Sequence, residues 1–420
     1  MATSKATISR LRRIVDYLDA TKNEIAVDEE MLRISGLEAK QVGYIPRVPK
    51  WGAYAKRSPS LIRNIARILY LFWVLGLGTA LMFLQFAPRW LRAPRSISIP
   101  PATGYVLAFS VRVGDIIDSK TFPNLPKTWI TVPWAPLQRS PAGTQLVDLY
   151  SLLFKRDLVC ALMDAILAQR RLLRRASTRK WALQGYTAFK WFAVRAAVDK
   201  LTGSLVMADH FDRWAVLVDR SAREPRRHLT LIQHGTVADL DCTGKASPLL
   251  ANLHAKLKNV SQLYAYGPLD ELIFKMHIID VQNNFRELAV AHYSPHIELR
   301  KSTTKSPLSI LFVGHSLCEK IQSEVFKKLQ DHIEFSAYYK PHPLAPMSAD
   351  MTTIGWHIIT DPSHFPNVNL VIAYPSTLVI EYGALDIPAV VHPLNADSDQ
   401  CNTIVQEILG RISGLPPLIK

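Results

Sequence analysis

The sequence predicts an α/β protein built from two consecutive domains, with a helical extension at its N-terminus. Short apolar runs with strand character alternate with longer segments of helical periodicity, which is typical of α/β sheets. The same alternation starts again in the second half of the chain, without a repeat of the sequence itself. The 420 residues, 48% of them hydrophobic, can fill two cores, so a disordered chain is excluded.

The chain begins with a charged, amphipathic extension at residues 1–60, which we expect to be partly helical with a solvated or interfacial face. A membrane-associated apolar segment at 61–95 follows, and a proline-rich linker leads into the first domain at residues 100–250. For this domain the pattern predicts strands at 105–111, 128–135, 204–211 and 228–236, and helices at 145–173, 185–201 and 212–224.

The second domain is expected at residues 251–420. Its predicted strands are 262–267, 308–316, 333–340, 355–361, 370–376 and 388–393, and its predicted helices are 268–277, 319–332, 377–385 and 400–412. Sheets of this kind bind ligands at the carboxyl ends of their strands, and a cleft between two domains collects several such ends. We therefore expect the functional residues in the loops that follow the strands.

The composition limits the choice of partner. Fifty Lys and Arg against 35 Asp and Glu give a formal charge of +15, which favours phosphate, nucleic acid or an anionic bilayer. The four cysteines lie far apart and form no C-x-x-C pair, so we expect neither a metal site nor a disulfide framework. The charged N-terminus lacks the apolar stretch of a secretory signal, so none is expected.

The stretch Ile68–Ala87 carries no charge over twenty residues, which is enough to cross about 30 Å of hydrocarbon. Lysines and arginines flank it on both sides, although positive charge normally marks the cytoplasmic side alone. Gly76 and Gly78 near its middle would allow a re-entrant insertion with both ends in the cytoplasm. We expect attachment to the cytoplasmic face of the inner membrane, as a single span or a monotopic insertion; a buried helix of a soluble domain is the alternative.

The loop after the predicted strand 333–340 has an unusual composition. In "YYKPHPLAP", Lys340 and His342 stand between prolines, directly after an apolar run. Pro341 and Pro343 restrict the backbone and would hold an ammonium and an imidazole near one point, which suits a phosphate group. We predict that Lys340, His342 and Pro343 belong to a nucleotide site; a surface turn with incidental charges is the alternative.

The stretch "AYPSTLVIEYGALDIPAVV" adds a second loop to this predicted site. Ser376 and Thr377 begin a helix directly after a strand, where free N–H groups and two hydroxyls can hold a phosphate. Ser376 would also serve as an ordinary N-cap. Glu381 lies one turn further and would accept hydrogen bonds from ribose hydroxyls, unless it is an exposed helical glutamate.

The loop "VGHSLC" permits two interpretations. It nearly matches the G-x-S-x-G motif of serine hydrolases, with Ser316 as the nucleophile, but Cys318 is a poor fit for a position that must be small. In a nucleotide-binding domain the same loop would offer N–H groups to a phosphate. We predict the second role, with the residues Gly314, His315 and Ser316.

Candidate catalytic residues follow two strands of the first domain. "MADHFDRW" places Asp209 and His210 at one strand end, and "QHGTVADLD" places His234 at the next. Transfer with inversion needs a general base within reach of the acceptor hydroxyl, a role for histidine or a desolvated aspartate. The sequence leaves Asp209, His210 and His234 unranked, and each could instead be a hydrogen-bonded polar residue that closes a strand.

The order of these motifs resembles bacterial surface-polysaccharide glycosyltransferases of the GT-B type, over about residues 205–400. The pattern is most similar to the capsule polysialyltransferases and Kdo transferases, whose His-Pro and Ser-Thr motifs grip a CMP-sugar. The CDP-glycerol polymerases of teichoic acids share a similar arrangement. The resemblance implies two Rossmann-like domains facing a cleft, with His342 at the nucleotide phosphate, Ser376 and Thr377 at the same phosphate, and Glu381 near the ribose.

Two departures from these families affect the expected donor. The "S-D-Y-S-S" turn of the teichoic-acid enzymes is absent from "IAYPSTLVIEYG". The second glutamate that many UDP-sugar enzymes carry in this helix is also missing, because only Glu381 stands there. The resemblance therefore implies a CMP-sugar as co-substrate, with no further cofactor, and a membrane-presented glycan or lipid-linked acceptor.

Two other classes of protein remain as alternatives. The charge of +15 would suit a nucleic-acid binder, but no zinc finger, helix-turn-helix or RRM signature accompanies it, so nucleic acid is not the expected partner. The basic run "RRLLRRASTRK" is explained as well by an anionic membrane surface or an anionic acceptor. A non-catalytic membrane scaffold built on a transferase fold is the other alternative.

Overall fold

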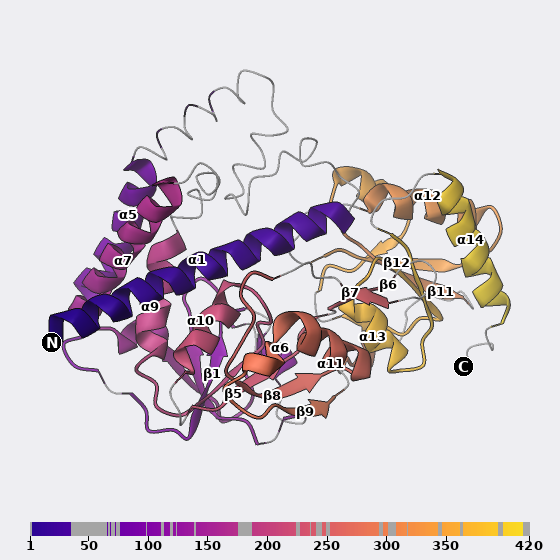
Figure 1. Cartoon of the computed structure of the whole chain (residues 1–420). Coiled ribbons are helices and arrows are strands. Elements are labelled where there is room, and N and C mark those ends of the chain that lie inside the picture. Colours follow the sequence, from indigo (N-terminus) through magenta and orange to yellow (C-terminus); the bar gives the residue numbers. More distant parts are fainter. Residues whose placement is uncertain are drawn as a thin grey trace. The chain divides into compact units, whose positions relative to one another are not determined.

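The computed structural model consists of two compact units, each built around a parallel β-sheet (Figure 1). Unit 1 comprises Met1–Glu30, Glu38–His234 and Leu250–His292, and unit 2 comprises Met31–Leu37, Gly235–Leu249 and Tyr293–Lys420. The residues that the structure describes are 2–34, 65, 68, 72, 76–97, 99–110, 113–117, 121–122, 124–137, 140–174, 187–223, 227–235, 237–240, 246–248, 253–293, 297–300, 308–316, 318–342, 347–361, 364–393 and 398–414.

The sheet of unit 1 has seven strands in the order β3-β2-β1-β4-β5-β8-β9, all parallel. The strand order reverses between β1 and β4, which is where sheets of this type bind ligands. The strands are β1 (Gly104–Ala108), β2 (Thr128–Thr131), β3 (Gln145–Asp148), β4 (Ser204–Met207), β5 (Leu229–Ile232), β8 (Val260–Ala265) and β9 (Ala289–His292). The predicted strands of the first domain are thus confirmed.

Helices α5, α7 and α9 of unit 1 pack against one another, and α9 also contacts α10 (Figure 1). Nine of the eleven residues of α9 are buried, because this helix is covered by its neighbours on nearly every side. The helical elements are α1 (Ala2–Ile34), α5 (Gly78–Arg92), α6 (Val113–Ile116), η2 (Leu149–Leu152), α7 (Lys155–Arg174), α9 (Ala188–Val198), α10 (Arg213–Ser221), α11 (Pro268–Ile273), the π-helical turn η4 (Phe274–Ile278) and η5 (Val281–Asn283).

Helix α1 is an integral part of unit 1: it has an exposed face, as at Leu11 and Val15, but also a buried face that the sequence analysis did not predict. Ile14, Tyr17 and Ala20 are fully buried, and the Tyr17 ring lies 5.4 Å from that of Trp191. Asn23 exchanges two hydrogen bonds of 2.8 Å with the backbone of Ala255. One face of α1 therefore packs on the α/β domain, where the sequence pattern alone showed only mixed charge and apolar residues.

The sheet of unit 2 has five parallel strands in the order β13-β12-β11-β15-β16. Alternate residues of β11 point to opposite faces: Ile310 and Phe312 join one apolar cluster, and Leu311 and Val313 join another. The first cluster is completed by α12 and α14, and the second by α13. Both faces of the sheet are thus covered, as its uninterrupted apolar strands require.

The strands of unit 2 are β11 (Ser309–Val313), β12 (Ser336–Lys340), β13 (His357–Ile358), β15 (Leu370–Ala373) and β16 (Ala389–Val391), together with the parallel pair β10 (Leu299–Arg300) and β14 (Phe365–Pro366) and the antiparallel pair β6 (Ala238–Leu240) and β7 (Ala246–Pro248). Its helical elements are α12 (Glu319–Gln330), η6 (Ala349–Thr353), α13 (Thr377–Gly383) and α14 (Ser398–Ser413). These strands and helices confirm the alternation predicted for the second half of the chain.

Two boundaries differ from those expected. The domain boundary was placed near residue 250, but β8 pairs with β5 and β9 pairs with β8, which extends the first sheet, so residues 260–292 belong to unit 1. The segment 145–173 was predicted as one helix, but it forms β3, then η2, then α7. Asp148 separates the first two, because its carboxylate accepts a hydrogen bond from the N–H of Tyr150 and begins a new helical turn.

The apolar stretch Ile68–Ala87 is described only in part, at Ile68, Phe72 and residues 76–87. Across the residues that the structure describes, no helix is both long enough and apolar enough to cross a membrane. The described end of the stretch forms most of α5, in which Met82 is fully buried and Phe86 contacts Phe189 at 5.9 Å between ring centroids. One face of α5 thus packs on the other helices of unit 1.

The ion pair between Glu24 and Arg213 is fully enclosed, with 2% and 7% of the two side chains exposed. Glu24→Ala removes the carboxylate and leaves the buried guanidinium without it, which costs about 3–5 kcal/mol in comparable pairs. We expect the free energy of unfolding, measured by urea denaturation, to fall by about that amount. The control Glu407→Ala breaks a partly exposed pair with Arg411 and should cost less than about 1 kcal/mol. If the free energy of unfolding falls equally little in both variants, the ion pair between Glu24 and Arg213 does not stabilise the packing of α1 on α10.

Candidate functional site

The carboxyl ends of parallel strands meet at one edge of a sheet, and in each unit polar side chains gather at that edge. In unit 1, Asp209 and His210 follow β4, and His234 follows β5. Because β4 and β5 are neighbours in the sheet, these residues lie close together. The ring centroids of His210 and His234 are 4.2 Å apart. The structure therefore brings the predicted histidines into one group.

The two histidines of this group differ in their environment. The backbone N–H of His234 donates a 2.7 Å hydrogen bond to Nε2 of His210, which must be unprotonated to accept it. Burial, and next the neighbouring His234, lower the pKa of His210 well below its usual range, although a hydrogen bond to the Ile232 backbone opposes this. His210 is thus a neutral, buried ring whose Nε2 lone pair is occupied. It orients the His234 backbone, and it is the weakest of the three candidates for a general base.

Asp209 precedes His210 at the same edge of the sheet and is 6% exposed. Its Oδ2 is buried and has no hydrogen-bond partner among the described residues. Burial, and next the nearby Asp212, raise the pKa of Asp209 well above its usual range. Asp212 itself caps α10, since its carboxylate accepts from the N–H groups of Trp214 and Ala215 at 2.9 Å. Asp209 is therefore a carboxyl group with an unused oxygen and a raised pKa, as proton transfer to or from a substrate requires.

An aromatic group at the same edge was missed from the sequence. Phe109 follows β1 and Trp134 follows β2. The rings of both residues contact the ring of Trp214, which lies in the first turn of α10. The two indoles stack with centroids 5.8 Å apart, and Lys190 lies over Trp134 at 5.1 Å. Burial, and next two neighbouring arginines, lower the pKa of Lys190. The position of Trp134 near the end of the predicted strand 128–135 was the available signal.

In unit 2, side chains after three neighbouring strands converge. His315 follows β11, His342 follows β12 and Tyr374 follows β15. The ring of His315 lies 5.1 Å from that of His342 and 5.3 Å from that of Tyr374. Burial lowers the pKa of His315, although Glu319 opposes this. Two of the predicted nucleotide-site residues therefore share one group, and Tyr374 joins them.

Two other predicted residues have structural roles instead. The N–H of Gly314, expected to face a phosphate, donates a 2.8 Å hydrogen bond to the carbonyl of Lys340. A Cβ at this position would lie 2.2 Å from the Tyr339 ring, so the close approach that demands glycine is to Tyr339. The ammonium of Lys340 donates to the carbonyls of Asp361 at 3.4 Å and His364 at 2.9 Å. In this structure it is engaged with the chain itself, and its expected role at a phosphate stays a prediction.

The start of α13 agrees with both interpretations of Ser376. Its Oγ accepts a hydrogen bond of 3.4 Å from the N–H of Leu378, as an N-cap does. Thr377 and Glu381 lie one turn apart on the same face of the helix. Glu381 is only 9% exposed, so it is not the solvated glutamate of the alternative interpretation. Pro343 lies outside the described residues.

The loop between β11 and α12 does not have the geometry of a hydrolase nucleophile. That motif holds its serine in a strained turn. Outside glycine, Asp386 alone has a positive φ among the described residues, so Ser316 is unstrained. Cys318 is fully buried, and burial raises the pKa of its thiol to about 12. Within the described ranges no three His, Cys, Asp or Glu side chains gather as a metal ion would require.

No protein-family model and no curated protein matches this chain. Two solved structures show a distant likeness. The wall teichoic acid polymerase TagF is 11% identical, with a TM-score of 0.36, over 79% of this chain and 78% of that chain. The GtfA/B complex has a chain that is 10% identical, with a TM-score of 0.33, over 53% of this chain and 54% of that chain. This chain thus spans about half the length of the GtfA/B chain that it matches.

The raised pKa of Asp209 makes stability depend on pH. An aspartate in the unfolded chain titrates at about 3.9. Because the folded-state pKa is higher, the stability contributed by Asp209 is fully present below the unfolded value and is lost as the pH rises towards the folded value. We expect Asp209→Asn, which carries no charge, to unfold at the same temperature as the natural protein near pH 4 and at a higher temperature at pH 7.

Thermal unfolding at a series of pH values measures this difference. Asp331→Asn, at an exposed aspartate after α12, is the control and should change little at any pH. A difference between Asp209→Asn and the natural protein that stays constant from pH 4 to pH 7 would show that Asp209 keeps its charge in the folded state.

Proposed function

We propose that this protein is a glycosyltransferase of the GT-B type. It moves a sugar from a nucleotide-activated donor, with a CMP-sugar favoured, to a membrane-presented glycan or lipid acceptor in bacterial surface polysaccharide synthesis. The observation that carries the proposal is that two α/β units each hold a group of titratable side chains at the carboxyl edge of a parallel sheet: His315 with His342 in one, and His210 with His234, beside the buried Asp209, in the other. One such group in each unit suits a reaction between two substrates, a donor and an acceptor.

Unit 2 supplies the donor site in this proposal. Imidazole N–H groups of His315 and His342 can donate to phosphate oxygens, and Thr377, with its hydroxyl, begins helix α13, which follows the neighbouring strand β15. The ring of Tyr374 offers a flat apolar face beside them. Glu381 stands alone in its helix, and this favours CMP over UDP by the family resemblance. A CDP-glycerol-type or other sugar-phosphate polymer transferase is the second candidate, because it shares the His-Pro and serine arrangement.

Unit 1 supplies the acceptor chemistry. In transfer with inversion, a base takes the proton of the acceptor hydroxyl while its oxygen attacks the anomeric carbon, and the bond from that carbon to the donor phosphate breaks. Asp209 and His234 are the candidates for this base, and His210 positions the backbone of His234. Such a base contributes about 10²–10⁴-fold to the rate. The stacked Trp134 and Trp214 at the same edge provide apolar surface for a sugar ring.

His342→Ala tests the donor site. We expect it to weaken nucleotide binding by tenfold or more and to abolish transfer, because a hydrogen bond to a charged phosphate is worth about 1.5–3 kcal/mol. Calorimetric titration with CMP, CDP, UDP and GDP measures the affinity for each nucleotide and also identifies the nucleobase that the site prefers. His332→Ala, at an exposed histidine after α12, is the matched control and should bind as the natural protein does. Normal binding and transfer by His342→Ala would refute the proposed site.

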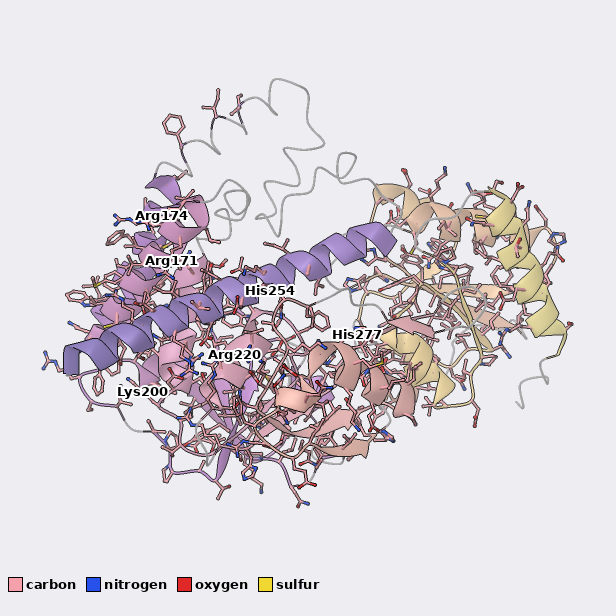
Figure 2. The ribbon with its side chains drawn as sticks, viewed as in Figure 1. Arg171, Arg174, Lys200, Arg220, His254 and His277 are labelled. Carbon is pink, nitrogen blue, oxygen red and sulfur yellow. The ribbon has the colours of Figure 1, made fainter. Side chains whose placement is uncertain are left out.

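We also propose that α5 attaches the protein to the cytoplasmic face of the inner membrane, where nucleotide sugars are made. Leu84 is 68% exposed and Leu91 is 70% exposed, and Leu77 lies on the same helical face. Arg89 and Arg92 end this helix. Figure 2 shows Arg171 and Arg174 on α7, which packs beside α5. An exposed apolar stripe with basic residues next to it favours a monotopic, interfacial helix on anionic lipid.

A double variant, Leu84→Glu with Leu91→Glu, tests this attachment. We expect it to reduce sedimentation with phosphatidylglycerol vesicles by tenfold or more, because burying one leucine contributes about 1.5–3 kcal/mol. Phe285→Glu is the control, since this phenylalanine is 74% exposed in another part of unit 1. Vesicle binding that survives the double variant would place the membrane contact elsewhere or nowhere on the protein.

A further inference from the structure

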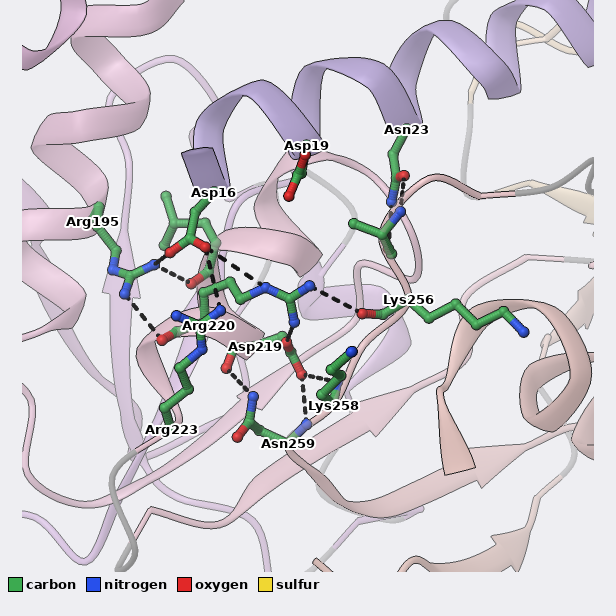
Figure 3. Close-up of polar contacts among 12 residues, drawn as sticks. Asp16, Asp19, Asn23, Arg195, Asp219, Arg220, Arg223, Lys256, Lys258 and Asn259 are labelled. Carbon is green, nitrogen blue, oxygen red and sulfur yellow. Dashed lines mark hydrogen bonds and ion pairs between the residues drawn. The ribbon is translucent and has the colours of Figure 1, made fainter. Parts of the chain in front are cut away.

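A second polar site lies in unit 1, between α1 and the ends of α9 and α10 (Figure 3). It is a cavity of about 290 Å³, and five arginines and two aspartates line it. The lining is Arg12, Arg13 and Asp16 of α1, Arg195 and Asp199 of α9, and Arg220 and Arg223 at the end of α10, with Ser9 and Ser221.

The cavity is separate from the carboxyl-edge group of the same unit. Helix α10 begins next to Asp212, close to Asp209, and its last residue is Ser221. Nine residues of α-helix span about 13 Å. The cavity therefore lies at the far end of α10 from the candidate base, and the proposed transfer reaction does not use it.

Some of the arginines have an evident structural role. Arg195 donates to the carbonyl of Arg220 at 3.0 Å and to that of Leu217 at 3.5 Å, and so binds the last turn of α10. Arg227, behind the cavity, donates to the carbonyls of Ser221 and Asp199. Carbonyls at a helix C-terminus would repel an anion, and these guanidinium groups offset that negative potential.

The positive charge that remains unbalanced is that of Arg223. Arg195 also pairs with Asp199 at 2.9 Å and Arg220 also pairs with Asp219, whereas Arg223, among the described residues, has only its share of Asp16. Asp16 is one carboxylate facing three guanidinium groups, at 3.4 Å from Arg195, 3.8 Å from Arg220 and 3.3 Å from Arg223. Figure 3 shows these three arginines arranged around it. Burial lowers the pKa of Arg223, and Arg220, Arg12 and Arg195 lower it further, although Asp16 opposes them. The cations thus repel one another, and a further anion would relieve that repulsion.

A buried hydroxyl in the cavity wall points independently to a ligand. Ser221 is 3% exposed, and its Oγ has no hydrogen-bond partner among the described residues. The carbonyl of Leu217, one turn before it, accepts from Arg195 instead. An unpaired buried hydroxyl destabilises the folded state. An oxygen atom of a ligand in the cavity would satisfy it.

We propose that this cavity binds a phosphate group. Guanidinium groups form paired hydrogen bonds with phosphate oxygens, so Arg12 and Arg223 would hold two of them while the Ser221 hydroxyl donates to a third. A water molecule occupies about 30 Å³ in the liquid, so a cavity of about 290 Å³ has room for the group. The phosphate is either a free, soluble one or the headgroup of a lipid. This site is additional to the proposed donor site in unit 2 and does not depend on it.

Equilibrium dialysis of the full-length protein with radiolabelled inorganic phosphate tests the site. The double variant Arg12→Ala with Arg223→Ala should weaken binding by about tenfold or more, since each removes a hydrogen bond between charged groups. Ser221→Ala should weaken it several-fold, whereas a serine without a ligand would leave phosphate affinity unchanged. Arg411→Ala, at an exposed arginine of α14, controls for the loss of positive charge.

Vesicles distinguish the two sources of phosphate. Phosphatidylcholine vesicles that contain phosphatidic acid are compared with vesicles that contain phosphatidylglycerol at equal charge. A preference for phosphatidic acid that Arg12→Ala with Arg223→Ala removes identifies a lipid headgroup; phosphate binding without that preference identifies a soluble ligand. The proposal is overturned if neither probe binds, or if the arginine and serine variants bind both probes as the Arg411→Ala control does.

Discussion

Parallel strands bring all their carboxyl ends to one edge of a sheet, and in both units this constraint decides which side chains meet. His315, His342 and Tyr374 are far apart in the sequence, yet they share a group because β11 lies between β12 and β15. His210 and His234 meet in unit 1 because β4 and β5 are neighbours. The sheets hold both groups on rigid elements, which is the arrangement that catalysis and binding need.

The surplus of positive charge is distributed over several tasks. Part of it is internal: Arg213 pairs with Glu24, and Arg195 pairs with Asp16 and also donates to a carbonyl at the end of α10. Part lies at the ends of α5 and α7, where Arg92 and Arg174 are on the surface of unit 1. The total charge of the chain therefore does not by itself identify a partner. Arg223, which among the described residues has only its share of Asp16, indicates where an anion would bind.

Burial separates residues that the sequence treats alike. Lys340 and His342 stand two positions apart in the same motif, but the ammonium of Lys340 binds backbone carbonyls while the ring of His342 lies against His315. Asp209 and Asp212 also share a motif. Asp212 is an N-cap, whereas Asp209 is buried with an unused oxygen and a raised pKa. The raised pKa of Asp209 follows from the protein around it.

The sequence by itself determined the strands, most of the helices and the loops that carry the candidate residues, because hydrophobic periodicity and capping act over a few neighbouring residues. It also located His315 and His342 in loops of one domain. The tertiary structure alone decided that α1 packs on unit 1, that β8 and β9 extend the first sheet, and that Asp209 is desolvated. Each of these depends on contacts between residues distant in the chain, such as Asp16 with Arg195, 179 positions apart. Local patterns carry no information about such partners, and burial is a property of the assembled core.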